Sequence, residues 1–368
     1  MAEAISTEVV IIGAGVIGLS IAERLAKHHE VILLEANEKF GQETSSRNSE
    51  VIHSGIYYPP DSRKTALCLR GRKLLYDFCA QAKVPYRKCG KLLVGTASDQ
   101  TAYIEKLAAH CQILEVPFER YSKKTIQEKE PNLEVGEGLF FPESGIVDSH
   151  QLMAALERRA IQAGAQLAYR HSLTQIACEG NDWVVQWETA EGKGTARAGR
   201  VINAAGLAAA RWSNQALGTT KYSHRFCRGK YFHLKSNYRN KFSHLVYPVP
   251  EKDGLGVHVT LDLSGDVRLG PDVEWCGNSS FEERSQWYEC DWEKSRGSFL
   301  KAAQRLCPQL RAEDLTPGLI GIRPKLFLNG EPRPDFLIEN HDGYIHCLGI
   351  ESPGLTAALA IAEQVGEI

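Results

Sequence analysis

A glycine-rich turn near the N-terminus is the first place where residue types and spacing suggest chemistry. Residues 13–18 read Gly-Ala-Gly-Val-Ile-Gly, a G-x-G-x-x-G pattern that follows a continuous apolar run. In such a pattern Gly13 allows a tight turn, Gly15 lets the backbone approach a pyrophosphate, and Gly18 lets the next helix pack closely on the strand. Glu35 ends the second apolar run, where a carboxylate can accept hydrogen bonds from an adenosine ribose. The pattern therefore predicts a dinucleotide site.

Three further features favour FAD over NAD as that dinucleotide. No second G-x-G-x-x-G precedes a helix, although an enzyme that binds both flavin and pyridine nucleotide needs one. A late apolar run ends in Asn203-Ala-Ala-Gly206, as in flavoproteins whose backbone approaches the cofactor here. Residues 349–356, Gly-Ile-Glu-Ser-Pro-Gly-Leu-Thr, open a C-terminal helix, and a helix N-terminus at the flavin stabilises its anionic reduced form.

The elements that must position these residues follow from hydrophobic periodicity. Buried strands over Glu8–Ile12 and Val31–Leu34 flank a helix over Gly15–Lys27, which makes a βαβ unit. The remaining expected elements are four helices and four strands: helices over Ser62–Gln81, Asp99–Ile113, Asp148–Gly164 and Ser352–Val365, and strands over Lys91–Val94, Ser172–Cys178, Trp183–Thr189 and Arg200–Asn203.

The order of these elements predicts an α/β fold with two interleaved lobes, and 368 residues suit two lobes better than one core. We expect a Rossmann-like FAD-binding domain interleaved with an antiparallel β-sheet substrate domain. The FAD-binding domain takes residues 1–83, 148–220 and 316–368, and the substrate-binding domain takes 84–147 and 221–315.

Charge and cysteine usage restrict the partners and the compartment. A formal net charge of −2 gives no global attraction to nucleic acid or to anionic lipid. The ten cysteines are scattered with no C-x-x-C pair, which predicts reduced thiols, no metal site and a cytosol-like compartment. The first residues carry no basic region and no Arg/Ser-rich transit segment, so we expect no leader, and no apolar run is long enough to span a bilayer. We therefore expect a cytoplasmic protein, with any membrane contact peripheral on the inner face.

One stretch, Lys221–Pro250, is locally basic, with several Lys and Arg and no Asp or Glu, interleaved with aromatic residues. Basic and aromatic residues together are also typical of single-stranded nucleic-acid binding. The stretch lies within the predicted substrate lobe and is followed by an acidic region, so nucleic acid is not expected. A sheet with a basic outer face, attraction of a dianionic substrate, and contact with a membrane surface remain open.

A longer segment carries a family resemblance. Residues 44–59, Thr-Ser-Ser-Arg-Asn-Ser-Glu-Val-Ile-His-Ser-Gly-Ile-Tyr-Tyr-Pro, resemble the D-amino-acid-oxidase-like superfamily of FAD enzymes, and most of all its L-2-hydroxyglutarate dehydrogenase/oxidase family. The usual family form here is N-S-G-V-I-H, whereas this chain has Glu50 in place of the glycine. Further matching stretches run in order along the chain, at residues 66–71, 247–250, 256–260, 269–271, 321–325 and 349–356.

The resemblance implies a set of cofactor-binding residues. Serine and threonine hydroxyls with an arginine suit a buried pyrophosphate, because they form charge-assisted hydrogen bonds. The residues expected to contact FAD are Gly13, Ala14, Gly15, Gly18, Glu35, Thr44, Ser45, Ser46, Arg47, Leu173, Ala205, Gly206, Gly354, Leu355 and Thr356.

Oxidation of a 2-hydroxy acid needs a cation for the carboxylate and a base for the hydroxyl proton. Arg323, in a G-x-R-P sequence where the superfamily places a substrate arginine, is expected to grip the carboxylate. Lys325 and Arg228 are weaker candidates for a second carboxylate. His258 and His53 compete as base, and His53 could instead bond the flavin, through a hydrogen bond or covalently.

Three other side chains are candidates for substrate contact because of their place on extended segments. Thr260 shares a strand face with His258 because side chains alternate. Tyr57 and Tyr58 follow one another, so at most one of the two is expected to face the substrate.

Together these features predict an FAD-dependent oxidoreductase acting on a small 2-hydroxy acid, with L-2-hydroxyglutarate as the favoured substrate. An amino-acid or amine oxidase of the same superfamily is the first alternative, and a flavin-dependent regulatory protein is the second. Oxygen, a quinone and an electron-transfer flavoprotein all remain open as electron acceptors.

Overall fold

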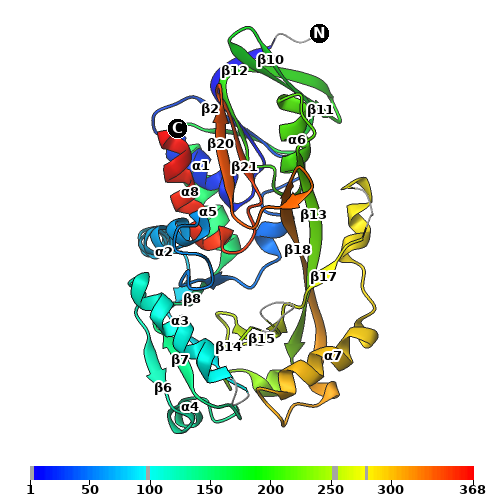
Figure 1. The fold of residues 1–368 in the computed structure, drawn as a ribbon. Coiled ribbons are helices and arrows are strands. Elements are labelled where there is room, and N and C mark those ends of the chain that lie inside the picture. Colours follow the sequence, from blue (N-terminus) through cyan, green and yellow to red (C-terminus); the bar gives the residue numbers. More distant parts are fainter. Residues whose placement is uncertain (1–3, 97–99, 251–255, 278–280) are drawn as a thin grey trace.

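The structure, a computed structural model, describes residues 4–96, 100–250, 256–277 and 281–368. Two lobes are arranged one above the other, and the chain passes between them several times (Figure 1). None of the helices in the described ranges is both long and apolar enough to cross a membrane. All ten cysteines fall in these ranges and carry free thiols.

The upper lobe in Figure 1 is built on an eight-stranded sheet with a parallel centre. The parallel strands pair in register from Val9↔Val31 to Ile12↔Leu34 on one side and from Ile5↔Ala196 to Ile12↔Asn203 on the other. Its strands, in spatial order, are β10 (Ser172–Glu179), β11 (Asp182–Thr189), β12 (Gly192–Asn203), β1 (Ile5–Ile12), β2 (Val31–Leu34) and β9 (Gln166–Ala168), with β21 (Tyr344–Leu348) beside β12 and β20 (Leu337–His341) beside β21.

Helices cover one face of this sheet and bury its main core. The alternate strand residues Val9, Ile11 and Leu33 pack with apolar residues of the helices in one hydrophobic cluster, in which most side chains are almost fully buried. Burial of this kind contributes about 25 cal/mol per Å² of apolar surface. These helices are α1 (Val16–Leu25), α2 (Arg63–Ala82), α5 (Ser149–Gln162) and α8 (Gly354–Glu367), while α6 (Ala209–Ala216) packs on β10 and β13.

The lower lobe is built on a ten-stranded sheet, mostly antiparallel. Its strands are β19 (Glu331–Pro332), β18 (Leu315–Leu328), β13 (Tyr222–Leu234), β16 (Val267–Gly270), β15 (His258–Leu261), β14 (Leu245–Pro248), β5 (Lys91–Val94), β7 (Gly138–Phe141) and β6 (Glu119–Tyr121), with β17 (Glu274–Trp275) beside β13. The helices of this lobe are α3 (Thr101–Ile113), α4 (Lys123–Lys129) and α7 (Trp292–Gln304). A small sheet of β3 (Val51–Ile52), β8 (Gly145–Val147) and β4 (Tyr86–Arg87) joins the lobes.

The expected βαβ unit is confirmed, with β2 at its predicted bounds and α1 two residues shorter at its C-terminal end. The predicted cap of α5 is also present, because the Asp148 side chain accepts a hydrogen bond from Gln151 N at 2.9 Å. The helix expected over Asp99–Ile113 is described from Thr101 onward, and Asp99 lies outside the described residues.

The return to the FAD-binding lobe, expected near residue 316, comes later. Strand β18 begins at Leu315 and pairs with β13 from Leu234 back to Tyr222, so it belongs to the second sheet. Both strands are long enough to run between the lobes, and Tyr222 and Leu326 pack with residues of the upper lobe. The difference from the expected boundary arises because β18 pairs continuously with β13, and the local pattern of apolar residues does not reveal such pairing.

Candidate active site

A cavity of about 1020 Å³ lies between the two lobes, at the upper end of the range usual for cofactor and ligand sites. One end is formed by the turn after β1 and the end of β2. The other end is formed by β13, β15 and β18 of the second sheet, and the segment after β21 closes one side.

The glycines of the turn after β1 bring the start of α1 to the cavity. Gly13 has a φ of +100°, and a Cβ there would lie 2.7 Å from the carbonyl oxygen of Ala204. Gly18 allows the helix to pack on the turn, because its Cβ would meet Gly13 O at 1.9 Å. Gly18 itself does not line the cavity.

Helix α1 has no side-chain cap from Gly15 and no acidic residue in its first turn. In the first turn, Val16 N donates a hydrogen bond to Ser45 Oγ at 3.0 Å. The N-terminus of α1 therefore presents a positive dipole end toward the cavity, which suits the binding of a phosphate group.

Glu35 lies at the end of β2 and lines the same end of the cavity. Its Oε2 accepts a hydrogen bond from Ala14 N at 2.7 Å, and its Oε1 accepts from Asn37 N and Nδ2 at 2.8 Å. These bonds hold the carboxylate in place while leaving lone pairs for further donors, such as ribose hydroxyls. Ala14 contributes through this backbone bond and has no exposed surface of its own.

The segment of Thr44–Arg47 lies between α1 and β18. Thr44 Oγ1 donates to Ile322 O at 3.0 Å, and Arg47 lies 4.7 Å from the Tyr288 ring centroid. Thr44, Ser45 and Arg47 line the cavity, whereas Ser46 does not and bonds Glu43 O instead.

The remaining predicted cofactor residues come from three separate segments. Leu173, Ala205 and Gly206 line the cavity, and so do Gly354 and Leu355 at the start of α8. Thr356 lies just behind them and is fully buried: its Oγ1 accepts from His53 N at 3.0 Å and donates to Val51 O at 3.3 Å. Thr356 thus connects α8 to the segment that carries His53.

These residues fit FAD on structural grounds. The cavity is large enough for a dinucleotide, two uncapped helix N-termini open onto it, and an oriented carboxylate lies at one end. Gly13 and Gly15, where a Cβ would crowd Ala204 O and Ser45 Oγ, line the same cavity.

Arg323 lies at the other end, on β18, and lines the cavity. Its Nη2 donates to Asp272 O at 2.7 Å and to Arg228 O at 3.2 Å. Within the described part of the chain no carboxylate pairs with this guanidinium. An anchored arginine with free donors is ready to bind a carboxylate in a bidentate manner.

His258 and His53 both line this end of the cavity. His258 is 3% exposed, its ring stacks on Tyr247 at 3.7 Å between centroids, and its Nδ1 has no hydrogen-bond partner in the described part of the chain. His53 Nε2 lies 3.3 Å from Ser352 Oγ. Desolvation lowers the pKa of His53 to about 3 and holds the pKa of His258 well below its usual value, and Lys91 adds to both effects. Each imidazole is therefore neutral near pH 7 and able to accept a proton.

Tyr57 and Tyr58, of which at most one was expected to face the substrate, both line the cavity. The chain turns at Ile56–Tyr58 after Gly55, which has a φ of +82°, so these residues do not alternate as they would on an extended strand. Burial raises the pKa of both phenols, and both are hydroxyl donors at neutral pH.

Two predicted substrate residues do not line the cavity. Side chains alternate along β13, and the cavity is lined by Cys227, Gly229 and Tyr231, so Arg228 points to the opposite face. There Arg228 forms an ion pair with Glu274. Thr260 lies deeper along β15 than His258, has no exposed surface, and donates to Arg268 O at 3.4 Å.

The basic stretch is partly neutralised within the fold. Lys230, which is almost fully buried, forms ion pairs with Asp272 and with the same Glu274 that binds Arg228. These two cations are therefore not available to a distant partner.

Lys325 lines the cavity and forms an ion pair with Glu351 at 2.8 Å. Lys64 binds the same carboxylate at 3.0 Å. Burial would raise the pKa of Glu351, but the two lysines outweigh it and hold that pKa below its usual value. Two cations and one anion leave this cluster with a net charge of about +1.

Glu50, where the family form has glycine, also lines the cavity. It has a φ of +58°, a left-handed conformation that favours glycine. Its carboxylate forms an ion pair with the buried Arg268 at 2.7 Å and accepts from Ser149 N and Oγ at 3.2 and 3.0 Å. These bonds offset the backbone strain.

The sequence did not point to Lys91, which lies directly behind the cavity. It is fully buried in β5, and no described residue forms a hydrogen bond with its Nζ. The ammonium lies 4.6 Å from the ring centroid of Tyr57 and 5.0 Å from that of Tyr247, both of which line the cavity. Burial lowers the pKa of Lys91 to about 7. Its only signal in the sequence is a lysine at the start of an apolar strand.

The fold and the cavity together define a flavin-binding oxidoreductase architecture, with a dinucleotide end in one lobe and an arginine and histidine end in the other. The chain belongs to the family of FAD dependent oxidoreductases, whose model matches residues 8–368.

Proteins of similar sequence match this chain over nearly its full length. The chain is 37% identical to the mitochondrial L-2-hydroxyglutarate dehydrogenase of Arabidopsis thaliana, covering 97% of this chain and 82% of that protein. It is 29% identical to L-2-hydroxyglutarate dehydrogenase of Escherichia coli K12, covering 97% and 91%. Among solved structures, FAD-bound L-alpha-glycerophosphate oxidase of Mycoplasma pneumoniae superposes with a TM-score of 0.87 at 24% identity, covering 98% of this chain and 94% of that chain. The predictions of an FAD cofactor and of this family are therefore confirmed.

Proposed function

We propose that this enzyme oxidises L-2-hydroxyglutarate to 2-oxoglutarate. The observation that carries the proposal is Arg323, an anchored guanidinium without a carboxylate partner among the described residues, on the same cavity as two neutral histidines. The names of the relatives that match along the whole chain support the same substrate.

FAD, when bound, accepts the hydride that leaves the substrate Cα. The residues that would hold it are those of the turn after β1, Glu35, Ser45, Arg47 and the start of α8. The turn after β1 would bind the phosphates, and Glu35 would bind the adenosine ribose. The start of α8 would place a helix N-terminus beside the ring system and stabilise negative charge there.

The two carboxylates of the substrate would be bound by two cations on one strand. Arg323 and Lys325 lie two residues apart on β18, so their side chains share a face, about 7 Å apart along the strand. Both line the cavity. Arg323 would bind the carboxylate next to the reacting carbon, and the net positive cluster of Lys325, Lys64 and Glu351 would bind the distal one.

The hydroxyl proton would pass to a ring nitrogen of His53 or His258. Both rings are neutral near pH 7, and neither base needs to lose a proton first. Tyr57 and Tyr58, which also line the cavity, would donate hydrogen bonds to the substrate and help exclude water from its hydroxyl group.

Anaerobic bleaching of the flavin absorbance tests the proposal. L-2-Hydroxyglutarate should reduce the holoenzyme faster than its D enantiomer, 2-hydroxybutyrate, L-glutamate or glycerol 3-phosphate. Reduction by an amine but not by the hydroxy diacid would identify the enzyme as an amino-acid or amine oxidase instead, and no reduction by any small acid or amine would favour a regulatory flavoprotein.

Substrate discrimination tests the two-cation arrangement separately. Lys325→Gln should reduce kcat/KM for L-2-hydroxyglutarate while leaving that for 2-hydroxybutyrate almost unchanged, because only the former has a distal carboxylate. Arg225→Gln is the matched control, since Arg225 pairs in register with Lys325 but lies outside the cavity. Equal losses for both substrates would contradict the assignment of Lys325.

We also propose the division of labour between the lobes and the location. Residues of the first sheet would bind FAD, those of the second would bind substrate, and β13 and β18 would serve both. Ten free thiols suit a reducing, cytosol-like compartment, with any membrane contact at the surface. Reoxidation of the reduced enzyme by oxygen, a quinone or an electron-transfer flavoprotein, compared side by side, would identify the acceptor.

A further inference from the structure

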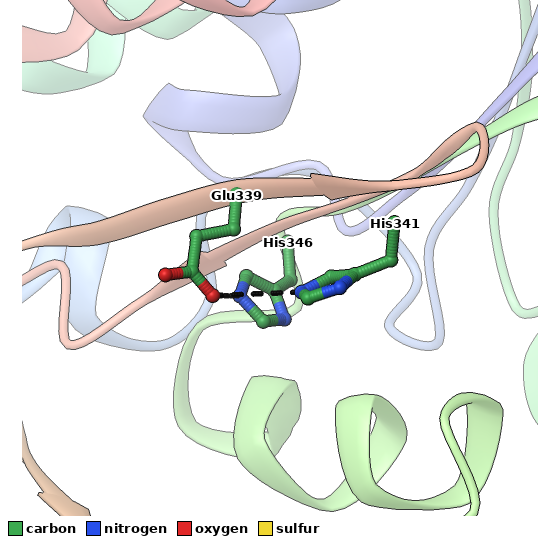
Figure 2. Close-up of side chains that lie close together, drawn as sticks. All are labelled: Glu339, His341 and His346. Atoms are coloured by element: carbon green, nitrogen blue, oxygen red, sulfur yellow. Dashed lines mark ion pairs between the residues drawn. The ribbon is translucent and has the colours of Figure 1, made fainter.

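Three potential metal ligands lie together on the β20–β21 hairpin, away from the flavin cavity. Glu339 and His341 are two residues apart on β20, so their side chains share a face. His346 lies on β21 directly opposite Glu339 in the antiparallel register. Figure 2 shows the three side chains on one side of the hairpin, with dashed lines marking the ion pairs between the Glu339 carboxylate and the two imidazoles. None of the three lines the flavin cavity.

The spacing of the ligand atoms suits a tetrahedral ion. Glu339 Oε2 lies 3.5 Å from His341 Nε2 and 3.5 Å from His346 Nε2, and the three ligand atoms all lie within 4.8 Å of one another. Zinc–ligand bonds of about 2.0–2.1 Å in a tetrahedron place neighbouring ligand atoms roughly 3.3–3.4 Å apart. The two carboxylate–imidazole distances already lie within about 0.2 Å of that spacing.

The burial of His346 is the second, independent observation. Its side chain is 0% exposed, yet among the described residues neither ring nitrogen has a hydrogen-bond partner, and His341 Nε2 also lacks one there. Buried polar groups are nearly always hydrogen-bonded, because leaving one unpaired costs about 1–3 kcal/mol. A metal ion would satisfy the nitrogen that faces Glu339.

We propose that Glu339, His341 and His346 form a binding site for Zn²⁺, with the fourth position open to water. Two imidazoles and one carboxylate are a ligand set that zinc uses in proteins. The sequence had predicted no metal site, and only the pairing of β20 with β21 brings these residues together.

Charges around the Glu339–His341–His346 cluster affect how strongly it should bind a zinc ion. Lys221 is the cation that lies close enough to affect His346, and it also interacts with Glu339. Its positive charge opposes a bound dication.

The described residues contain one other cluster of possible ligands, Glu50 with Asp148 and His150. There Glu50 is already paired with Arg268 and Asp148 caps α5, so its oxygens are committed.

A bound ion would join the two strands of the hairpin near its turn. Strand β21 continues directly into Gly349–Leu355, the segment that lines the flavin cavity. An ion that binds only the folded state stabilises it by RT ln(1 + [Zn²⁺]/Kd), which is about 2.7 kcal/mol at a hundredfold excess over Kd. The ion would therefore act in stability, and its ligands take no part in the oxidation.

Calorimetric titration of ZnCl₂ into the FAD-loaded, chelator-treated enzyme tests the site. We expect one ion per chain on these ligands. Binding should be weaker by at least about tenfold in His341→Ala and in Glu339→Gln, because even partners of metal ligands contribute that much. Both side chains are partly exposed, so the variants should fold. Lys221→Gln should bind zinc more tightly.

Two control variants separate this site from others. His150→Ala removes the ligand of the second cluster, and Cys178→Ser removes the exposed thiol. Both should leave the affinity unchanged. The proposal is overturned if the parent enzyme binds no zinc, if His341→Ala binds it as tightly as the parent, or if either control abolishes binding. Melting temperatures with and without zinc provide a readout that does not depend on turnover.

Discussion

Replacement of Glu50 by glycine should destabilise this enzyme even though its backbone conformation is one that glycine prefers. The side chain holds the buried Arg268 and the N-terminal residue of α5, Ser149. Removal of one partner from a buried ion pair costs about 3–5 kcal/mol. Glu50 is about one-fifth exposed, at 19%, which argues for the lower end of that range.

Relief of the left-handed backbone at φ +58° returns about 1–2 kcal/mol. The difference is a net loss of about 2 kcal/mol for Glu50→Gly. Glu50→Ala removes the same carboxylate but keeps a Cβ in the left-handed conformation. It should therefore be about 1–2 kcal/mol less stable than the glycine variant.

Thermal denaturation with FAD in fixed excess measures both differences, because bound cofactor itself raises the melting temperature. A loss of about 2 kcal/mol corresponds to a fall of roughly 4 °C or somewhat less in a chain of this size. Combining Glu50→Gly with Arg268→Met should restore most of the stability, since an apolar side chain replaces the unpaired cation. Alanine and glycine variants of equal stability would refute the backbone argument, and a glycine variant more stable than the parent would refute the role of the ion pair.

Four further predictions concern the cavity. Arg323→Met should lower kcat/KM for the best hydroxy acid by about 10²-fold, because truncating one partner of a buried charge pair costs roughly 2–5 kcal/mol; a tenfold loss or less would contradict its role. Glu35→Gln should release FAD more readily on dilution, as measured by flavin fluorescence, while the flavin that stays bound should still be reduced by substrate. Between pH 5 and 8 the profile of kcat/KM should show no limb near 6.5, since the pKa of His53 is about 3 and that of His258 is also lowered. Replacing the true base by glutamine should reduce kcat/KM by about 10²–10⁴-fold, and replacing the other histidine should reduce it far less. The pKa of Lys91 is about 7 in the folded protein and about 10.5 in the unfolded chain, so the unfolded chain binds more protons between these values, and the stability of the wild type should rise with pH across that window. Thermal melts of Lys91→Met should lack this rise, which is on the order of a few kcal/mol. An unchanged slope of stability against pH in the variant would count against the lowered pKa.

The dinucleotide end was predictable because its determinants are local. The glycine turn, the buried strands on either side and the acid at the end of β2 lie within 35 residues, and their spacing reflects strand and helix geometry directly. Arg323 and the two histidines could be proposed only through the family resemblance, since no local pattern separates them from other arginines and histidines. The structure brings these three residues to one cavity, and their roles remain predictions.

The sequence by itself determined the cofactor class, the family, the βαβ unit and several helices, because turn chemistry and periodicity act over a few residues. Tertiary structure alone decided which faces of the paired strands β13 and β18 meet the cavity, and so excluded Arg228 from it while retaining Arg323. It also placed Lys91 behind the two tyrosines and opposed His346 to Glu339 across a hairpin. These outcomes depend on strand register and on contacts between distant segments, in which a shift of one residue turns each side chain to the other face.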